Sequence, residues 1–197
     1  ETSLHAELSW RYAGERVSFS ATGFITSFQD YIFLAETADV EDGLPVFLWA
    51  QEDADFVGAE VEFSSTLGTV GAGDVDLSLF ADIVSAELDD GGNLPRISPA
   101  RLGGRLEYRS DWIIAGADLV QVFDQDDVAE FESQTDGYTM FNLDLAVTVA
   151  RSSQVPVELF LRGTNLLDEE ARRHVSFVKD LAPLPGRNFT LGLRGRF

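Results

Sequence analysis

Residues that carry catalytic chemistry are scarce in this sequence. It has no cysteine, which excludes a disulfide, a thiolate metal site and a Cys-His arrangement. It has only two histidines, His5 and His174, so a Ser-His-Asp arrangement has few candidate bases. Glu60 and Glu62 lie two residues apart on a predicted strand, so their side chains share one face. A glycosidase pair would also need a substrate cleft, so we interpret these two carboxylates as charges on a polar strand face. We therefore predict that the chain is not an enzyme and needs no cofactor.

The acidic residues are the better candidates for binding. Asp124-Gln125-Asp126-Asp127 offers oxygen ligands to a hard cation, but an EF-hand needs Gly at its sixth position and Glu at its twelfth, where Ala129 and Thr135 stand. His174 carries an imidazole, which suits zinc, copper, iron or nickel. The candidate substrate-binding residues are Asp124, Asp126, Asp127, Asp168, Glu169, Glu170 and His174. The alternatives are a solvated acidic loop and an exposed histidine near lipopolysaccharide, and the metal itself stays unknown.

The overall charge excludes one class of partner. The net charge is −20, from 34 acidic and 14 basic residues, and such a chain repels nucleic acid, whose binding requires Lys and Arg at the phosphates. An acidic surface attracts cations instead. No apolar run approaches the roughly 18 residues that a membrane helix needs.

Period-two alternation of apolar and polar residues dominates the chain. In the last segment Phe189, Leu191 and Leu193 alternate with polar or small residues, and the segment from Phe141 to Val149 repeats the pattern. The pattern predicts about nine antiparallel strands, at 3–12, 16–34, 56–66, 74–87, 99–109, 112–123, 137–150, 155–164 and 187–197. Such strands build either a soluble sandwich with buried apolar faces or a transmembrane barrel with apolar faces toward lipid.

The connections between these strands favour the barrel. Short turns at 13–15, 67–73, 110–111 and 151–155 alternate with long connections at 35–55, 88–98, 124–136 and 165–186. Outer-membrane barrels sort short and long connections onto opposite rims in this way. Acidic residues gather in the long connections, whereas the short ones hold only Glu15 and Asp111. We expect Leu143, Leu145, Leu191 and Leu193 to face lipid and strand-end aromatics to form girdles: Trp10, Tyr12, Tyr108, Trp112, Tyr138 and Phe197.

Nine is an odd number of strands, and bacterial single-chain barrels have even numbers. An open sheet also leaves two edges unpaired. We therefore expect further strands on the N-terminal side, so that this chain is the C-terminal portion of a larger barrel.

Three stretches resemble the C-terminal half of TonB-dependent outer-membrane receptors. The first runs from Ala54 to Glu62, with Gly58 and Glu60 two apart, and the second is the Pro-rich stretch from Leu94 to Leu102. The third combines Thr164-Asn165-Leu166-Leu167-Asp168, Pro185-Gly186-Arg187-Asn188-Phe189 and the terminal Phe197. Their order, spacing and position against the chain end cover essentially the whole chain.

Further stretches are similar to zinc-uptake-type receptors: Gly43-Leu44-Pro45-Val46, Phe131-Glu132-Ser133-Gln134-Thr135 and His174-Val175-Ser176-Phe177-Val178-Lys179-Asp180. The His-rich loops of such receptors are absent here. The resemblance implies a plugged barrel of about 22 strands, of which residues 1–197 would supply roughly strands fourteen to twenty-two.

The resemblance also implies function and partners. It implies TonB-dependent active uptake of a scarce metal ion or metal chelate, such as a siderophore, through the outer membrane of a Gram-negative bacterium. Expected partners are outer-membrane lipid and lipopolysaccharide, the TonB energising complex through an N-terminal region absent from these residues, and the barrel-assembly machinery. The assembly machinery would read a terminal signal at Phe189, Leu191, Leu193 and Phe197. The alternatives are a passive porin-like small barrel and a soluble acidic β-sandwich that binds a partner.

Overall fold

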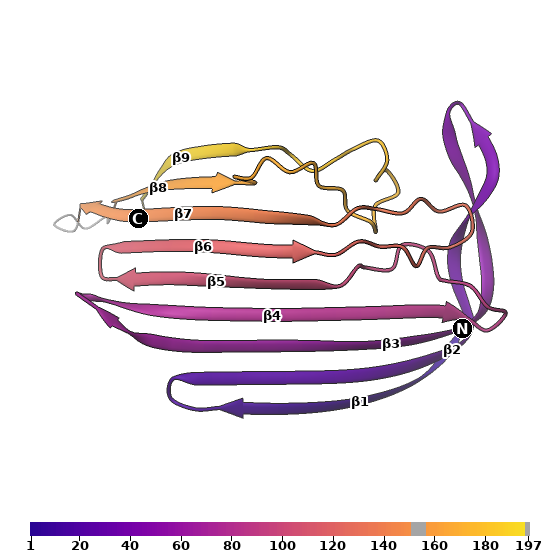
Figure 1. Ribbon diagram of the computed structural model, residues 1–197, viewed down its shortest axis with the longest axis horizontal. Helices are drawn as coiled ribbons and strands as arrows, with labels where there is room; N and C mark the ends of the chain where they lie inside the picture. Colours follow the sequence, from indigo (N-terminus) through magenta and orange to yellow (C-terminus); the bar gives the residue numbers. More distant parts are fainter. Residues whose placement is uncertain (151–156, 196–197) are drawn as a thin grey trace.

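The structure is a computed structural model that describes residues 1–150 and 157–195. Within these residues one antiparallel sheet holds nine strands in chain order (Figure 1). The strands are β1 (Thr2–Ala13), β2 (Val17–Glu41), β3 (Leu44–Val70), β4 (Gly73–Leu88), β5 (Arg101–Ser110), β6 (Ile113–Val122), β7 (Tyr138–Ala150), β8 (Val157–Thr164) and β9 (Asn188–Gly195). Among the described residues there is no helix long and apolar enough to cross a membrane.

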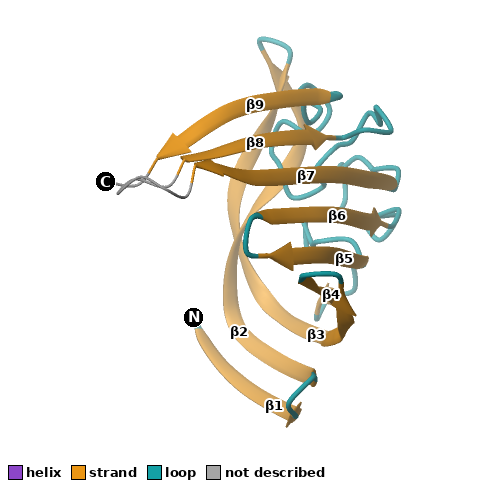
Figure 2. Ribbon diagram, turned by 90° about the vertical axis from the view of Figure 1, so that its left-hand side faces the viewer, coloured by secondary structure: helices purple, strands orange, loops and turns teal. Residues whose placement is uncertain are grey.

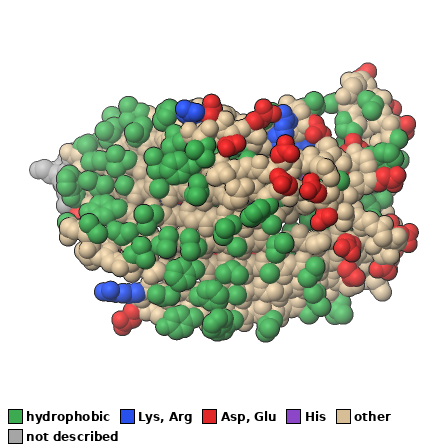
Figure 3. All heavy atoms as spheres, in the orientation of Figure 1, with side chains coloured by type: hydrophobic (Ala, Val, Ile, Leu, Met, Phe, Trp, Pro, Cys, Tyr) green, Lys and Arg blue, Asp and Glu red, His purple; other side chains and the backbone are tan. Residues whose placement is uncertain are grey.

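The apolar face of this sheet is exposed. Leu143, Leu145, Leu191 and Leu193 are 43%, 39%, 70% and 71% exposed, and Figure 3 shows hydrophobic side chains spread over the strands. A sandwich would cover these side chains with a second sheet, and the described residues form only one. The prediction of exposed apolar strand faces is confirmed, and the sandwich alternative is wrong.

The two rims of the sheet differ as predicted. The turns Gly14–Arg16, Gly71–Ala72 and Asp111–Trp112 lie on one rim, named here the inner rim. The tip of the β2–β3 hairpin and the connections 89–100, 123–137 and 165–187 lie on the other, the outer rim (Figures 1 and 2). Acidic side chains gather toward this outer rim in Figure 3. The short turn predicted at 151–155 lies outside the described residues.

One predicted connection is wrong. Residues 35–55 belong almost entirely to β2 and β3, which continue beyond their neighbours as a two-stranded ribbon that ends in an Asp42–Gly43 turn. Both turn residues have positive φ, 52° and 82°, as a type I′ hairpin turn requires. The alternation is lost here because consecutive apolar residues such as Phe47 and Leu48 place apolar side chains on both faces of the ribbon. The Asp-Gly pair was the signal that would have predicted the hairpin.

The remaining strand bounds agree with the prediction to within a few residues at most ends. The last two strands pair antiparallel, from Val157 with Gly195 to Thr164 with Asn188, as expected. Among the described residues β1 and β9 are the two edges of the sheet, so they do not close a small barrel with each other. The predicted terminal residue Phe197 lies outside the described residues.

The opposite face of the sheet is polar and carries paired charges. Arg105 lies 2.7 Å from Asp118, 2.8 Å from Asp144 and 2.9 Å from Glu107, and this set joins three neighbouring strands. Arg101 pairs with Asp82 across β4 and β5, and Arg194 pairs with Glu158 across β8 and β9. Charges of opposite sign on this face therefore pair across neighbouring strands.

A small apolar core lies where the ribbon leaves the sheet. Ala54, Ala86 and Leu94 are buried there, and the rings of Tyr31 and Phe56 pack beside them with centroids 5.4 Å apart. Leu94 belongs to the β4–β5 connection and donates its backbone N–H to Ala86 at 3.0 Å. This core therefore anchors an outer connection against the base of the ribbon.

Candidate functional site

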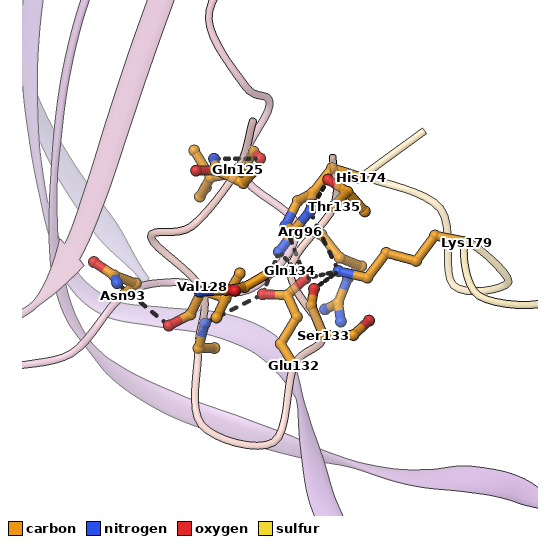
Figure 4. A network of polar contacts seen from close by, with 12 residues as sticks. Asn93, Arg96, Gln125, Val128, Glu132, Ser133, Gln134, Thr135, His174 and Lys179 are labelled. Atoms are coloured by element: carbon orange, nitrogen blue, oxygen red, sulfur yellow. Dashed lines mark hydrogen bonds and ion pairs between the residues drawn. The ribbon is translucent and has the colours of Figure 1, made fainter. Parts of the chain in front are cut away.

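The outer rim holds a buried cluster of charges that we name the outer clasp: Arg96, Glu132, His174 and Lys179 (Figure 4). Glu132 is its centre. One carboxylate oxygen lies 3.0 Å from the Lys179 ammonium and 3.1 Å from His174 Nε2. The carboxylate also accepts the backbone N–H of Arg96 at 3.0 Å and that of Ala129 at 3.2 Å. The side chains of Glu132, His174 and Lys179 are only 4%, 1% and 7% exposed, so this charge is compensated inside the protein.

Lys179 uses all three of its ammonium donors within the clasp. It donates to Glu132, to the Ser133 carbonyl at 2.6 Å and to His174 Nδ1 at 3.3 Å. Because an ammonium can only donate, Nδ1 must accept this bond, and the ring proton then lies on Nε2 toward Glu132. The Nε2 atom lies close to Glu132 but lacks the alignment of a hydrogen bond, so the neutral ring acts on the carboxylate through the dipole of its N–H group.

The electrostatics favour ionised Glu132. Burial by itself raises the pKa of this carboxyl, but the contacts with His174 and Lys179 and the N–H of Ala129 outweigh it and hold the pKa at about 2. Burial lowers the pKa of Arg96, against the opposing influence of Glu132 and Glu36. Both groups stay charged at any pH at which a receptor works.

Arg96 connects the clasp to the ribbon. Its guanidinium donates to the Leu34 carbonyl at 2.6 Å and lies over the ring of Phe177, 4.3 Å from the centroid. Phe177 in turn meets Phe47 of the ribbon edge to face at 5.3 Å. The β2–β3 ribbon is therefore held against the β4–β5 and β8–β9 connections by one arginine and two aromatic rings.

Two further contacts join the β6–β7 and β8–β9 connections. The Ser133 hydroxyl donates to Asp180 at 2.8 Å, and the Thr135 hydroxyl lies 3.0 Å from His174 Nδ1. All of these residues lie in the two stretches, 131–135 and 174–180, that resemble zinc-uptake-type receptors. In this structure the two stretches face each other and fasten two connections together.

Asn165 folds the beginning of the last connection. Its amide donates to the carbonyls of Glu169 and Pro185 at 2.9 and 3.1 Å, and its side-chain oxygen accepts the N–H of Glu169 at 2.9 Å. Asp168 accepts the backbone N–H of Arg187 at 2.9 Å. The Asn-Leu-Leu-Asp and Pro-Gly-Arg motifs therefore meet in space and close the two ends of this connection.

The predicted acidic ligands do not converge. Asp124 caps the N–H of Gly137, and Glu170 pairs with Arg172 at 2.8 Å. Asp168 lies beside Arg187, whereas Glu169 contributes its backbone to the Asn165 turn. In residues 1–150 and 157–195 no group of three or more His, Cys, Asp or Glu side chains could hold a metal ion. Asp126 and Asp127 are exposed on the β6–β7 connection.

The expectation of an exposed His174 is wrong. The ring is buried because it packs between Thr135, Glu132 and Lys179, none of which was predicted to be its neighbour. Its neighbour Lys179 is a cation, which disfavours a metal ion at the same place. No local pattern marks Glu132 or Lys179 as buried, because each lies in a connection otherwise rich in exposed charges. Glu132 and Lys179 do lie in the stretches 131–135 and 174–180 singled out above, but that resemblance predicted neither their burial nor their contact.

Comparison with known proteins identifies relatives of this arrangement. A family described as "TonB dependent receptor-like, beta-barrel" matches residues 1–166. The structure resembles that of the copper transporter OprC, with a TM-score of 0.77 and 20% identity over 97% of this chain and 30% of the other. It also resembles the ferric-catecholate import receptor Fiu from E. coli K12 in its closed form, with a TM-score of 0.65 and 17% identity over 97% of this chain and 27% of the other. The chain thus spans about a third of the length of each of these two proteins.

Proposed function

Because this chain belongs to the TonB-dependent receptor β-barrel family, we propose that it forms part of the barrel wall of a receptor that takes up a scarce metal ion or metal chelate. In this proposal the whole of residues 1–197 is the C-terminal part of the barrel, and the plug and the other strands lie in the remainder of the protein.

One observation carries the proposal. The sheet has an apolar face that no second layer covers, a polar face of paired charges, and three outer connections fastened to one another and to the β2–β3 ribbon at one rim. In a barrel that faces lipid, backbone groups must all be paired between strands, and polar side chains must point into the lumen. The apolar face then contacts outer-membrane lipid, and the outer rim with its acidic side chains lies on the lipopolysaccharide side.

The names of the two structural relatives indicate the class of cargo. One is described as a copper transporter and the other as a ferric-catecholate import receptor. Both descriptions involve a transition metal, one as the metal and one as a chelate. The proposed cargo accordingly remains a metal ion or a metal chelate, with TonB as the energising partner and the barrel-assembly machinery as the partner during insertion.

Whole-cell uptake tests this proposal. Cells that carry or lack the gene for the full-length protein would be supplied with radioactive iron, copper and zinc, each as the free ion and as a chelate. We expect gene-dependent uptake of one of these species, and we expect that uptake to stop when TonB is deleted. Uptake that depends on the gene but continues without TonB would favour a passive porin-like barrel instead.

The predicted acidic ligands are tested in the same assay. If Asp126 and Asp127 help to gather a free cation, the double substitution Asp126→Asn and Asp127→Asn should slow uptake at low metal concentration. The matched control is the neighbouring exposed Glu130→Gln, which removes one charge from the same connection without touching either predicted ligand.

A further inference from the structure

A pocket of about 440 Å³ opens on the polar face just beneath the outer clasp. Three arginines line it, Arg101 from β5 and Arg172 and Arg173 from the β8–β9 connection. This is unusual in a chain that has 34 acidic and only 14 basic residues. The pocket is therefore a cationic site within an acidic protein, and the acidic composition of the chain does not explain it.

The three guanidinium groups differ in how many hydrogen bonds they already form within the protein. Arg101 donates through Nε to Asp82, and its two terminal nitrogens form no hydrogen bond with the residues that the structure describes. Arg172 is more fully engaged, because it donates to the Lys179 carbonyl at 2.6 Å and to Glu170 at 2.8 Å. Arg173 is exposed and forms no hydrogen bond or ion pair with any residue in 1–150 or 157–195. The pocket thus presents free donors, mainly from Arg173 and Arg101.

The rest of the lining is apolar. Tyr138, Met140, Val122 and Leu184 contribute carbon surface between the arginines. Ligand pockets of several hundred Å³ typically combine such apolar walls with a few convergent polar groups. Tyr138, which was predicted as part of an aromatic girdle, lines this pocket on the polar face instead. The pocket suits a ligand that carries negative oxygens on an apolar or aromatic body.

The outer clasp holds this pocket in shape. His174 is the next residue after Arg173 and is buried against Glu132, and Lys179 accepts a hydrogen bond from Arg172 through its carbonyl. Figure 4 shows His174 and Lys179 converging on Glu132 from the β8–β9 connection. Fixing these two residues fixes the backbone from which both arginines extend over the pocket. Because this backbone is already fixed, the connection loses little backbone entropy when a ligand binds.

We propose that this arginine pocket binds an anionic ligand, and, on the basis of the uptake function proposed above, that the cargo is a metal chelate with carboxylate or phenolate oxygens and not a free metal cation. Guanidinium groups match such oxygens through paired N–H donors. A free cation would be repelled by the three arginines at short range, where salt screening is weak.

Binding to the purified full-length receptor tests this proposal. The probes are ferric citrate and a ferric tris-catecholate as anionic chelates, and Cu²⁺ and Zn²⁺ as free cations, each titrated by calorimetry. We expect one of the chelates to bind, and Arg173→Gln to weaken that binding about tenfold, the loss expected for one charge-assisted hydrogen bond. The matched control is Arg187→Gln, an arginine of the same rim that does not line the pocket. Affinity should also fall as salt rises.

Two results would overturn the inference. One is equal chelate affinity in the Arg173→Gln and Arg187→Gln variants. This result is also expected if another part of the receptor fills the pocket, which would equally contradict the inference. The other is tight binding of Cu²⁺ or Zn²⁺ alone with no chelate bound. TonB-dependent uptake of a free cation would support the proposed uptake function but contradict the proposed anionic cargo. Chelate binding that depends on Arg173, without any TonB-dependent uptake, would support the anionic ligand but contradict the uptake function.

Discussion

Glu132 and Lys179 are 47 residues apart in the chain, and their side chains meet at 3.0 Å inside the outer clasp. This one ion pair joins the β6–β7 and β8–β9 connections. Through the backbone N–H of Arg96 and its guanidinium, the same carboxylate also reaches the β4–β5 connection and the β2–β3 ribbon. The three outer connections and the ribbon are therefore linked, directly or through Arg96, to one buried negative charge.

Replacing Glu132 should release these connections. Glu132→Gln keeps the shape of the side chain but leaves the Lys179 ammonium buried without a counter-charge, which typically costs about 3–5 kcal/mol. We expect the backbone amides of residues 126–135 and 171–184 to exchange hydrogen much faster, while the strands stay protected. Hydrogen exchange on the full-length receptor in nanodiscs measures this, with Glu130→Gln as the exposed control. Unchanged protection of both connections would show that the ion pair does not hold them.

The clasp should open in acid, and the sign follows from Glu132. Its pKa falls from an ordinary value of 4.5 to about 2 in the folded protein. A group with a lowered pKa contributes stability that is fully present above about pH 4.5 and is lost as the pH falls toward 2. Spin labels on Glu130→Cys and Leu181→Cys should report one narrow distance at pH 6 and a broad distribution near pH 2. In the Glu132→Gln background the distribution should already be broad at pH 6; a narrow one there would contradict the prediction.

Gly103 should resist any side chain because of its neighbour across the strands. A Cβ atom on Gly103 would lie 2.4 Å from the ring of Phe80, its paired residue on β4. We expect Gly103→Ala to destabilise the protein by about 1–3 kcal/mol through overpacking. Phe80→Leu in the same molecule should recover part of this loss, and a double-mutant cycle on urea unfolding in lipid vesicles measures the coupling. Gly23→Ala is the control, since its Cβ would meet only one backbone oxygen, at 3.9 Å. Purely additive effects would mean that the ring does not restrict this position.

A charge on the apolar face should be costly, whereas one on the polar face should not. Leu191 is 70% exposed on β9, and in a membrane that exposure is to lipid. Leu191→Arg should destabilise the folded receptor by roughly 2–4 kcal/mol if the residue lies near the bilayer midplane. Thr190→Arg, one residue away on the polar face, should have a much smaller effect. Unfolding in vesicles compares the two variants, and equal costs would contradict the assignment of the faces.

The amino-acid sequence by itself determined the repeating part of this protein. Alternation along segments such as Phe141 to Val149 fixes which side chains share a face, because strand geometry has a period of two. The alternating lengths of the connections then fix which rim each one occupies. These local rules predicted an antiparallel barrel wall, its exposed leucines and the pairing of β8 with β9, and the structure confirms them.

Tertiary structure alone decided what the outer connections do. A glutamate in such a connection has the same kind of sequence neighbours whether it is solvated or buried. Nothing local therefore distinguishes Glu132, whose side chain is buried, from Glu130, which is exposed. Nothing beside His174 in the sequence marks it as buried, because two of its partners, Thr135 and Glu132, lie 39 and 42 residues away in the chain. Contacts between residues so far apart in the chain depend on how the three connections and the ribbon fold against one another, and no periodicity within one connection encodes that. The arginine pocket arises in the same way, from one residue on β5 and two on a connection brought over it by the clasp.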